Sequence, residues 1–178
     1  FRALTDIMQS QFRFVCLTDD TLGLAQGIET MPLPAFKMDR QHWHKGMWPK
    51  LGAFAPDLFE PGTPIIMMDV DVVVLRDLTP LFDHLREHGG LHIIREIPDT
   101  LPRTFPKLFP KTLLSNSSVV GFRAGEQEHL FEMFRNKTIE EVSKFRNDQN
   151  FIHYHAKNRQ SWPIGWMQSF KKDLAWHF

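Results

Sequence analysis

The chain has 178 residues, a length that fits one α/β domain. Lysine plus arginine and aspartate plus glutamate number 21 each, so the formal net charge is zero. Without a basic excess the chain lacks the electrostatic field that draws proteins onto nucleic acid, and we expect no nucleic-acid partner. No apolar stretch approaches the ~18 residues of a membrane span, so we expect no transmembrane segment.

The single cysteine, Cys16, has no partner for an internal disulfide and lies in an apolar segment. This setting is typical of a buried strand thiol in a reducing compartment. We therefore expect a cytoplasmic protein, or one that is peripheral to the inner face of the membrane. The chain opens on Phe1 without an initiator methionine. We expect a partial domain, truncated at both ends.

The first half of the chain predicts strands and one helix before its most apolar segment. Residues 11–18 are rich in Phe, Val and Leu, and they predict a strand that ends at Asp19-Asp20. Residues 35–38 follow two prolines and predict a short parallel strand. Residues 48–59 place apolar side chains at helical spacing and predict a helix that lies on the sheet.

Residues 64–75 are apolar on both alternate faces apart from their aspartates, which is typical of a central strand covered by helices on both sides. Residues 79–88 predict a helix with Thr79 as a candidate cap, ended by Gly89-Gly90. Asp77 is expected to support the turn before this helix through side-chain hydrogen bonds.

The second half continues the alternation of strands and helices. Residues 98–110 hold four prolines and predict a mobile loop, a candidate lid over the bound substrate. The other predicted elements are strands at residues 91–97 and 117–122, and helices at residues 126–135, 140–145 and 149–156. The alternation predicts an α/β fold with a single, mostly parallel sheet flanked by helices.

Asp69 and Asp71 are the most distinctive candidate site residues. Residues two apart on a strand point to the same face, ~7 Å apart, so both carboxylates can share one divalent cation. Mg²⁺ and Mn²⁺ prefer hard oxygen ligands, and such sites use one or two carboxylates while a substrate diphosphate completes the shell. Two unpaired carboxylates buried in a strand would cost several kcal/mol, which favours a site at a strand end.

The segment 66–78 resembles the "strand, Asp-x-Asp, Asp-Leu" block of retaining family-8 glycosyltransferases and their bacterial surface-polysaccharide relatives. Residues 48–54, Trp-Pro-Lys-Leu-Gly-Ala-Phe, are similar to the family's "Trp-x-Lys-Leu-x-x-Phe" helix. Residues 116–122 are similar to its "Asn-Ser-Gly-Val" strand, and residues 148–149 match its "Asp-Gln" pair. The blocks occur in the family's order over about residues 12 to 170. The resemblance implies the A-type (GT-A) fold of enzymes that use nucleotide-diphospho-sugars.

The resemblance also implies roles for individual residues. It implies that Asp69 and Asp71 bind Mn²⁺ or Mg²⁺, and that Asp69 also touches the donor ribose. Lys50 is expected to approach the sugar or the phosphates of the donor. Asn116 is expected to lie beside the donor sugar.

For the reaction itself, the resemblance implies that Asp148 and Gln149 line the face where the acceptor hydroxyl attacks. Two features depart from the family pattern. Ser118 replaces the family's usual glycine. The family's third metal ligand, a histidine in a C-terminal "His-x-Gly" segment, has no match in this sequence and is expected beyond Phe178.

These observations predict a metal-dependent hexosyltransferase of polysaccharide biosynthesis that transfers a sugar from a nucleoside-diphosphate sugar, UDP-sugar foremost, to a glycan or other hydroxyl acceptor. The resemblance implies retention of the anomeric configuration. Two alternatives stay open. One is a pyrophosphorylase-like nucleotidyltransferase, whose usual glycine-rich phosphate loop we do not find in the sequence. The other is a non-catalytic domain that binds sugar nucleotides or glycans.

Overall fold

A computed structural model describes residues 2–96 and 114–168 of the chain, and the predicted lid at residues 98–110 lies outside the described residues. The helices are α1 (Arg2–Ile7), η1 (Arg40–Lys45), η2 (Trp48–Phe54), α2 (Thr79–His88), α3 (Glu128–Phe134), α4 (Ile139–Val142) and α5 (Asp148–His155), of which η1 and η2 are 3₁₀ helices. The strands are β1 (Val15–Leu17), β2 (Glu29–Met31), β3 (Pro64–Met68), β4 (Leu91–Glu96), β5 (Leu114–Arg123) and β6 (Arg159–Ser161).

The described strands form two sheets. β1 and β2 pair in parallel, and the larger sheet has the order β3-β5-β4-β6. β5 runs antiparallel to both of its neighbours, while β4 and β6 are parallel. The predicted α/β class is confirmed, but the arrangement differs from the single, mostly parallel sheet expected. Apolar patterns report which residues are buried, and they carry no information on strand direction.

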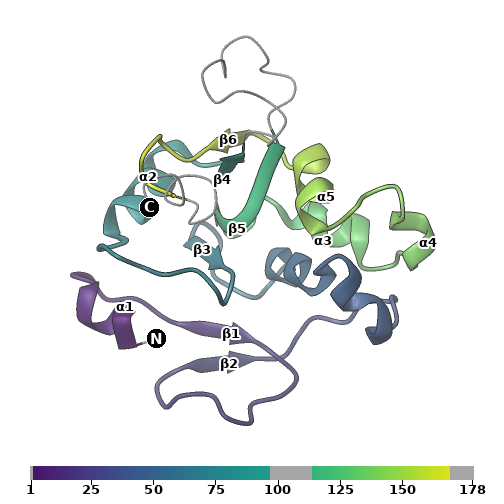
Figure 1. Ribbon diagram of the computed structural model, residues 1–178, viewed down its shortest axis with the longest axis horizontal. Coiled ribbons are helices and arrows are strands. Elements are labelled where there is room, and N and C mark those ends of the chain that lie inside the picture. The colour runs from purple at the N-terminus through teal and green to yellow at the C-terminus, as the bar shows by residue number, and fades with distance from the viewer. Residues whose placement is uncertain (1, 97–113, 169–178) are drawn as a thin grey trace, which may run out of the picture.

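Helices cover both faces of the larger sheet (Figure 1). One face packs against η2, α3 and α5, and the other packs against α2. β3 shows the alternation, because Ile65 and Met67 pack toward the first face whereas Ile66 and Met68 pack toward the second. The predicted strand and its cover on both faces are confirmed for this part, and the packing on both faces explains its continuous apolar sequence. Its predicted central place is wrong for the described strands, because β3 pairs only with β5 and lies at the edge of the larger sheet.

The prediction of a strand is wrong for residues 69–75. β3 ends at Met68, and the chain then turns, with the Val72 amide donating to the Asp69 carbonyl oxygen at 3.2 Å. Val70 is fully exposed, and Val73 and Leu75 are each 77% exposed. The apolar run therefore leaves the core, and Asp69 and Asp71 lie in a turn instead of on one face of a strand.

The strand predicted at residues 35–38 is also wrong. The strand that pairs with β1 is β2, three residues before this segment, and prolines at positions 32 and 34 separate the two. Phe36 and Met38 are apolar because they pack into the core beneath η2 and α3. Packing of an irregular segment thus produced the pattern that resembled a strand.

The turn before α2 follows the prediction for Asp77. Its carboxylate accepts hydrogen bonds from the Thr79 amide at 3.1 Å and from the Thr79 hydroxyl at 2.8 Å. Thr79 is the first residue of the helix and makes no side-chain cap bond of its own, so its predicted capping role passes to Asp77. The helix ends at Gly89 and Gly90, both of which have the positive φ that glycine tolerates.

A bulge in β5 shifts its pairing with β4. Ile93 lies opposite Val120, but the next residue, Ile94, lies opposite Asn116, so residues 117–119 have no partner on β4. Trp162 covers this gap, and its indole N–H donates to the Val119 carbonyl oxygen at 3.1 Å. Gly121 makes room for the indole, because a Cβ atom there would overlap the ring. The bulge leaves the backbone groups around Ser117 available to side chains.

His92 is fully buried on β4 beside His84 and Trp162, with ring centroids 4.7 and 5.2 Å away. Its Nε2 donates to the Gly89 carbonyl oxygen at 2.9 Å, so the proton of the neutral ring is on Nε2. Among the described residues its Nδ1 has no hydrogen-bond partner. Burial lowers the pKa of His92, an effect that the Gly89 carbonyl and Glu126 oppose and that His84 and His88 reinforce.

This burial predicts that acid destabilises the fold. Because the folded-state pKa of His92 is below the unfolded value of ~6.5, stability is fully present above pH ~6.5 and is lost as the pH falls below it. In urea titrations, the free energy of unfolding should fall between pH 7.5 and 5.5, and His92→Gln should reduce that fall. His44→Gln, at an exposed position, is the matched control. An equal fall in wild type and His92→Gln would contradict the assignment.

Candidate functional site

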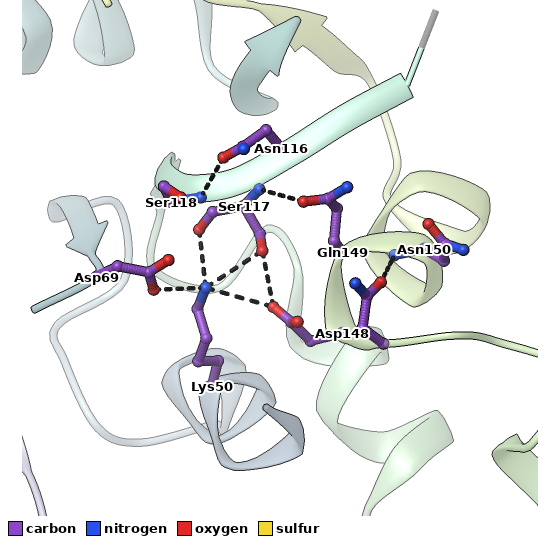
Figure 2. A network of polar contacts seen from close by, with 9 residues as sticks. Lys50, Asp69, Asn116, Ser117, Ser118, Asp148, Gln149 and Asn150 are labelled. Carbon is purple, nitrogen blue, oxygen red and sulfur yellow. Dashed lines mark hydrogen bonds and ion pairs between the residues drawn. The ribbon is translucent and has the colours of Figure 1, made fainter. Parts of the chain in front are cut away.

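Lys50 lies at the centre of a polar cluster between η2, the turn after β3, β5 and α5 (Figure 2). Its ammonium is 2.7 Å from Asp69 Oδ1 and 3.4 Å from Asp148 Oδ2. It also donates to the carbonyl oxygen of Ser117 at 3.0 Å. Only 15% of the Lys50 side chain is exposed, so the two carboxylates are what permit a charged amine at this depth.

η2 places Lys50 by anchoring its own apolar face. Trp48, Leu51 and Phe54 are buried in the core, and the Trp48 ring stacks on Phe134 of α3 at a centroid distance of 5.4 Å. Lys50 lies between these anchors in sequence and points to β5 instead. The apolar residues of the "Trp-x-Lys-Leu-x-x-Phe" block therefore hold the helix, and its lysine serves the cluster.

Asp148 is the most deeply buried charged group of the cluster, with 4% of its side chain exposed. Burial raises the pKa of the Asp148 carboxyl, and the Lys50 ammonium and the Ser117 hydroxyl lower it again in part. α5 begins at this residue: the Asn147 side chain accepts from the Asn150 amide at 3.0 Å, and the Asp148 amide donates to Gly46 at 2.8 Å. These two hydrogen bonds fix the backbone at the start of α5.

Ser117 joins the remaining members of the cluster, and the sequence did not identify it as a site residue. Its hydroxyl lies 3.2 Å from Lys50 and donates to Asp148 Oδ2 at 2.9 Å. Its amide donates to Gln149 Oε1 at 3.3 Å. The β5 bulge makes these contacts possible, because no β4 residue competes for the Ser117 backbone. The one signal in the sequence that could have identified Ser117 is its position inside the block at residues 116–122.

Asn116 and Ser118 stabilise the same bulge. The Asn116 side-chain oxygen accepts from the Ser118 amide at 2.8 Å, and the Ser118 carbonyl accepts from the Asp69 amide at 2.9 Å. Asn116 is half-buried, and its side chain lies beside the cluster without contacting Lys50 (Figure 2). The structure therefore brings five of the six sequence-predicted site residues to one place: Lys50, Asp69, Asn116, Asp148 and Gln149.

Asp71 is the sixth predicted residue, and it lies outside the cluster. It is exposed in the turn after β3, and within the described ranges its carboxylate makes no hydrogen bond or ion pair. The prediction that both carboxylates share a strand face is wrong because the strand has already ended. Asp69 and Asp71 still lie two residues apart in one accessible turn.

The acidic residues of this turn fit part of a metal site. In the described part of the chain there is no group of three or more His, Cys, Asp or Glu side chains that could hold a metal ion. Mg²⁺ and Mn²⁺ sites in which a substrate diphosphate supplies the other ligands need only one or two carboxylates. Asp69 turns one oxygen to Lys50 and the other away from it (Figure 2), so the donor set suits such a shared site.

Comparisons of the chain with protein-family models, with curated proteins and with solved structures found no match. Within residues 2–96 and 114–168, no helix has the length and apolar character needed to cross a membrane.

Loss of the Lys50 ammonium should destabilise the fold strongly at neutral pH. Lys50→Met leaves the buried Asp148 carboxylate unpaired, and removing one member of such a pair costs about 3 kcal/mol in the free energy of unfolding. Because the raised pKa of Asp148 rises further without Lys50, the loss should shrink as the pH falls toward the unfolded value of about 3.9. Urea titrations at pH 7.5 and 5 measure both effects.

Two further variants make this test specific. Lys50→Met/Asp148→Asn should recover most of the lost stability, since the unpaired charge is gone. Lys137→Met breaks an exposed ion pair with Glu141 and should cost at most about 0.5 kcal/mol. If Lys50→Met is as stable as Lys137→Met, the cluster does not hold the elements together.

Proposed function

We propose that the chain is the donor-binding part of a metal-dependent glycosyltransferase with a GT-A fold, which transfers a sugar from a nucleoside-diphosphate sugar to an acceptor hydroxyl. One observation carries the proposal. Four sequence blocks that resemble family-8 glycosyltransferases, dispersed over residues 48–149, meet in a single cluster around Lys50 (Figure 2). All three charged residues of the cluster, Lys50, Asp69 and Asp148, belong to these blocks.

The geometry supports a division of roles among the cluster residues. Asp69 and Asp71, in the turn after β3, would hold the cation together with the donor diphosphate. When bound, Mn²⁺ or Mg²⁺ supplies positive charge that neutralises the departing diphosphate. The Lys50 ammonium lies next to Asp69 and would add a second positive charge beside the sugar or the phosphates of the donor.

Asp148 and Gln149 divide the work at the start of α5. Asp148 is buried against Lys50 and Ser117, so its proposed role is to position the ammonium. Gln149 is half-buried, and among the described residues only its oxygen is bound, by the Ser117 amide. Its amide nitrogen can therefore donate to a hydroxyl of the sugar or the acceptor, which makes Gln149 the residue of the pair that contacts substrate.

Asp71→Asn tests the proposal most simply, because Asp71 is exposed and the substitution should leave the fold intact. Calorimetric titration with UDP and Mn²⁺ should show tight binding by the wild type and a loss of at least about tenfold in Asp71→Asn, the scale of one charge-assisted contact. Asp83→Asn, on the exposed side of α2, is the matched control and should bind like wild type. Unchanged Mn²⁺-dependent affinity in a folded Asp71→Asn variant would refute the metal site.

A further inference from the structure

A second polar group lies along β5, beyond the Lys50 cluster. Ser115 is buried, and its hydroxyl oxygen is 2.8 Å from Nη1 of Arg159 and 2.8 Å from Nδ1 of His153. The guanidinium can only donate, so the hydroxyl accepts from Arg159 and keeps one proton and one lone pair for His153. Burial and the Arg159 charge lower the pKa of His153, which favours the neutral imidazole. When the hydroxyl gives its proton to Nδ1, the proton of that neutral ring is on Nε2.

Arg159 and His153 both have donors left over. Five N–H groups belong to a guanidinium, and within the described ranges Arg159 donates only to Ser115 and forms no ion pair. Nor does any described carboxylate bind His153, whose hydrogen bond runs through Nδ1 alone. Burial lowers the pKa of Arg159, although the residue as a whole is exposed. Among residues 2–96 and 114–168, no carboxylate pairs with this positive charge.

The arrangement is built from rigid elements. Ser115 lies on β5 and contacts α5, as does Ser117 two residues later, which places them ~7 Å apart along the strand. His153 follows Gln149 by one turn on the same face of α5, and both accept hydrogen bonds from β5. The residues from Ser115 to Ser118 thus form a row of polar groups along β5. At its other end, the Asp69 amide donates to the Ser118 carbonyl oxygen.

The row therefore has two ends with different charge. The turn with Asp69 and Asp71 is acidic and suits a cation. The end with Arg159 and His153 is basic, and Arg95 lies opposite Ser115 in the β4–β5 ladder, where it adds another exposed basic residue. A guanidinium and an imidazole that are held by one hydroxyl offer several N–H donors, which suit the oxygens of a carboxylate or a phosphate.

We propose that Arg159 and His153, held by Ser115, bind an anionic group of the acceptor, a carboxylate or a phosphate. The identification of the ligand as the acceptor rests on the proposed function, because the donor diphosphate is assigned to the acidic turn at the far end of the row. The anion site itself rests only on the geometry of the three side chains. An acidic or phosphorylated sugar is thus the expected acceptor class.

Titration followed by NMR, without donor or metal, tests the site directly. Glucuronate and glucose 6-phosphate should bind the wild type, glucose should not, and the stronger of the two acidic sugars identifies carboxylate or phosphate as the ligand. Arg159→Gln should weaken the stronger probe roughly tenfold or more, the scale of a charge-assisted pair. Arg159→Lys keeps the charge but loses the planar guanidinium, so its affinity for the probe should lie between that of the wild type and that of Arg159→Gln.

Arg86→Gln is the matched control, because it removes the same charge from an exposed position on α2, across the sheet from α5 (Figure 1). Equal probe affinity in Arg159→Gln and Arg86→Gln, or no binding of either acidic sugar by the folded wild type, would overturn the site. UDP with Mn²⁺ should bind Arg159→Gln as tightly as wild type.

The two proposals can fail separately in this experiment. If Arg159→Gln weakens UDP binding as much as sugar binding, the site belongs to the donor and the acceptor assignment is wrong. If the wild type binds the acidic sugars through Arg159 but does not bind UDP with Mn²⁺, the anion site stands and the proposed glycosyltransferase function fails.

Discussion

One buried ammonium holds the candidate site together. Lys50 bonds to the turn after β3, to the backbone of β5 and to the first residue of α5, so three elements that are distant in sequence share one charge. An amine with 15% exposure would be costly without partners, and Asp148 with 4% exposure would be costlier still. Each group is tolerable because of the other. These contacts join the turn after β3 and the start of α5 to β5.

The bulge of β5 provides the backbone groups to which Lys50 and Gln149 bond. A regular ladder would have used the Ser117 amide and carbonyl for pairing with β4, and Lys50 and Gln149 would have lost their partners. Trp162 repairs the gap on the opposite face by donating to Val119. The cluster and the basic group at Arg159 therefore share one strand, which runs between an acidic and a basic end. Under the two proposals, a substrate bound along this strand would meet the proposed cation site and the proposed anion site in a fixed order.

The sequence predicted well where a pattern reflects burial alone. β3, α2 and β5 have the expected apolar faces, and Asp77 supports the turn before α2 as expected. The prediction from sequence failed where residues are buried outside a strand. Phe36 and Met38 are apolar because an irregular segment packs into the core, and this segment does not pair with any described strand. The exposed valines after Asp69 show the converse, since a run of apolar residues continued past the end of its strand.

The sequence predicted which residues belong to the site, but it did not predict how they are arranged in space. Spacing placed Asp69 and Asp71 on one strand face, but the chain turns at Asp69 because Lys50 and the Ser118 carbonyl hold it there. Only the ordered resemblance to a family grouped Lys50, Asn116, Asp148 and Gln149 with them. Ser117 escaped notice because its importance lies in backbone groups that a bulge sets free, and a side-chain pattern does not record a bulge. The same applies to Ser115, whose partners come from α5 and β6.

The products formed from a sugar nucleotide test the central claim most directly. The full chain would be incubated with a panel of UDP-sugars and Mn²⁺, and the products would be separated by chromatography. The proposed function predicts slow, Mn²⁺-dependent release of UDP and free sugar, which a chelator stops. Release of sugar 1-phosphate and UTP on addition of pyrophosphate would instead identify a nucleotidyltransferase, and binding of UDP-sugars without turnover of any of them would identify a non-catalytic binding domain; either result would contradict the account.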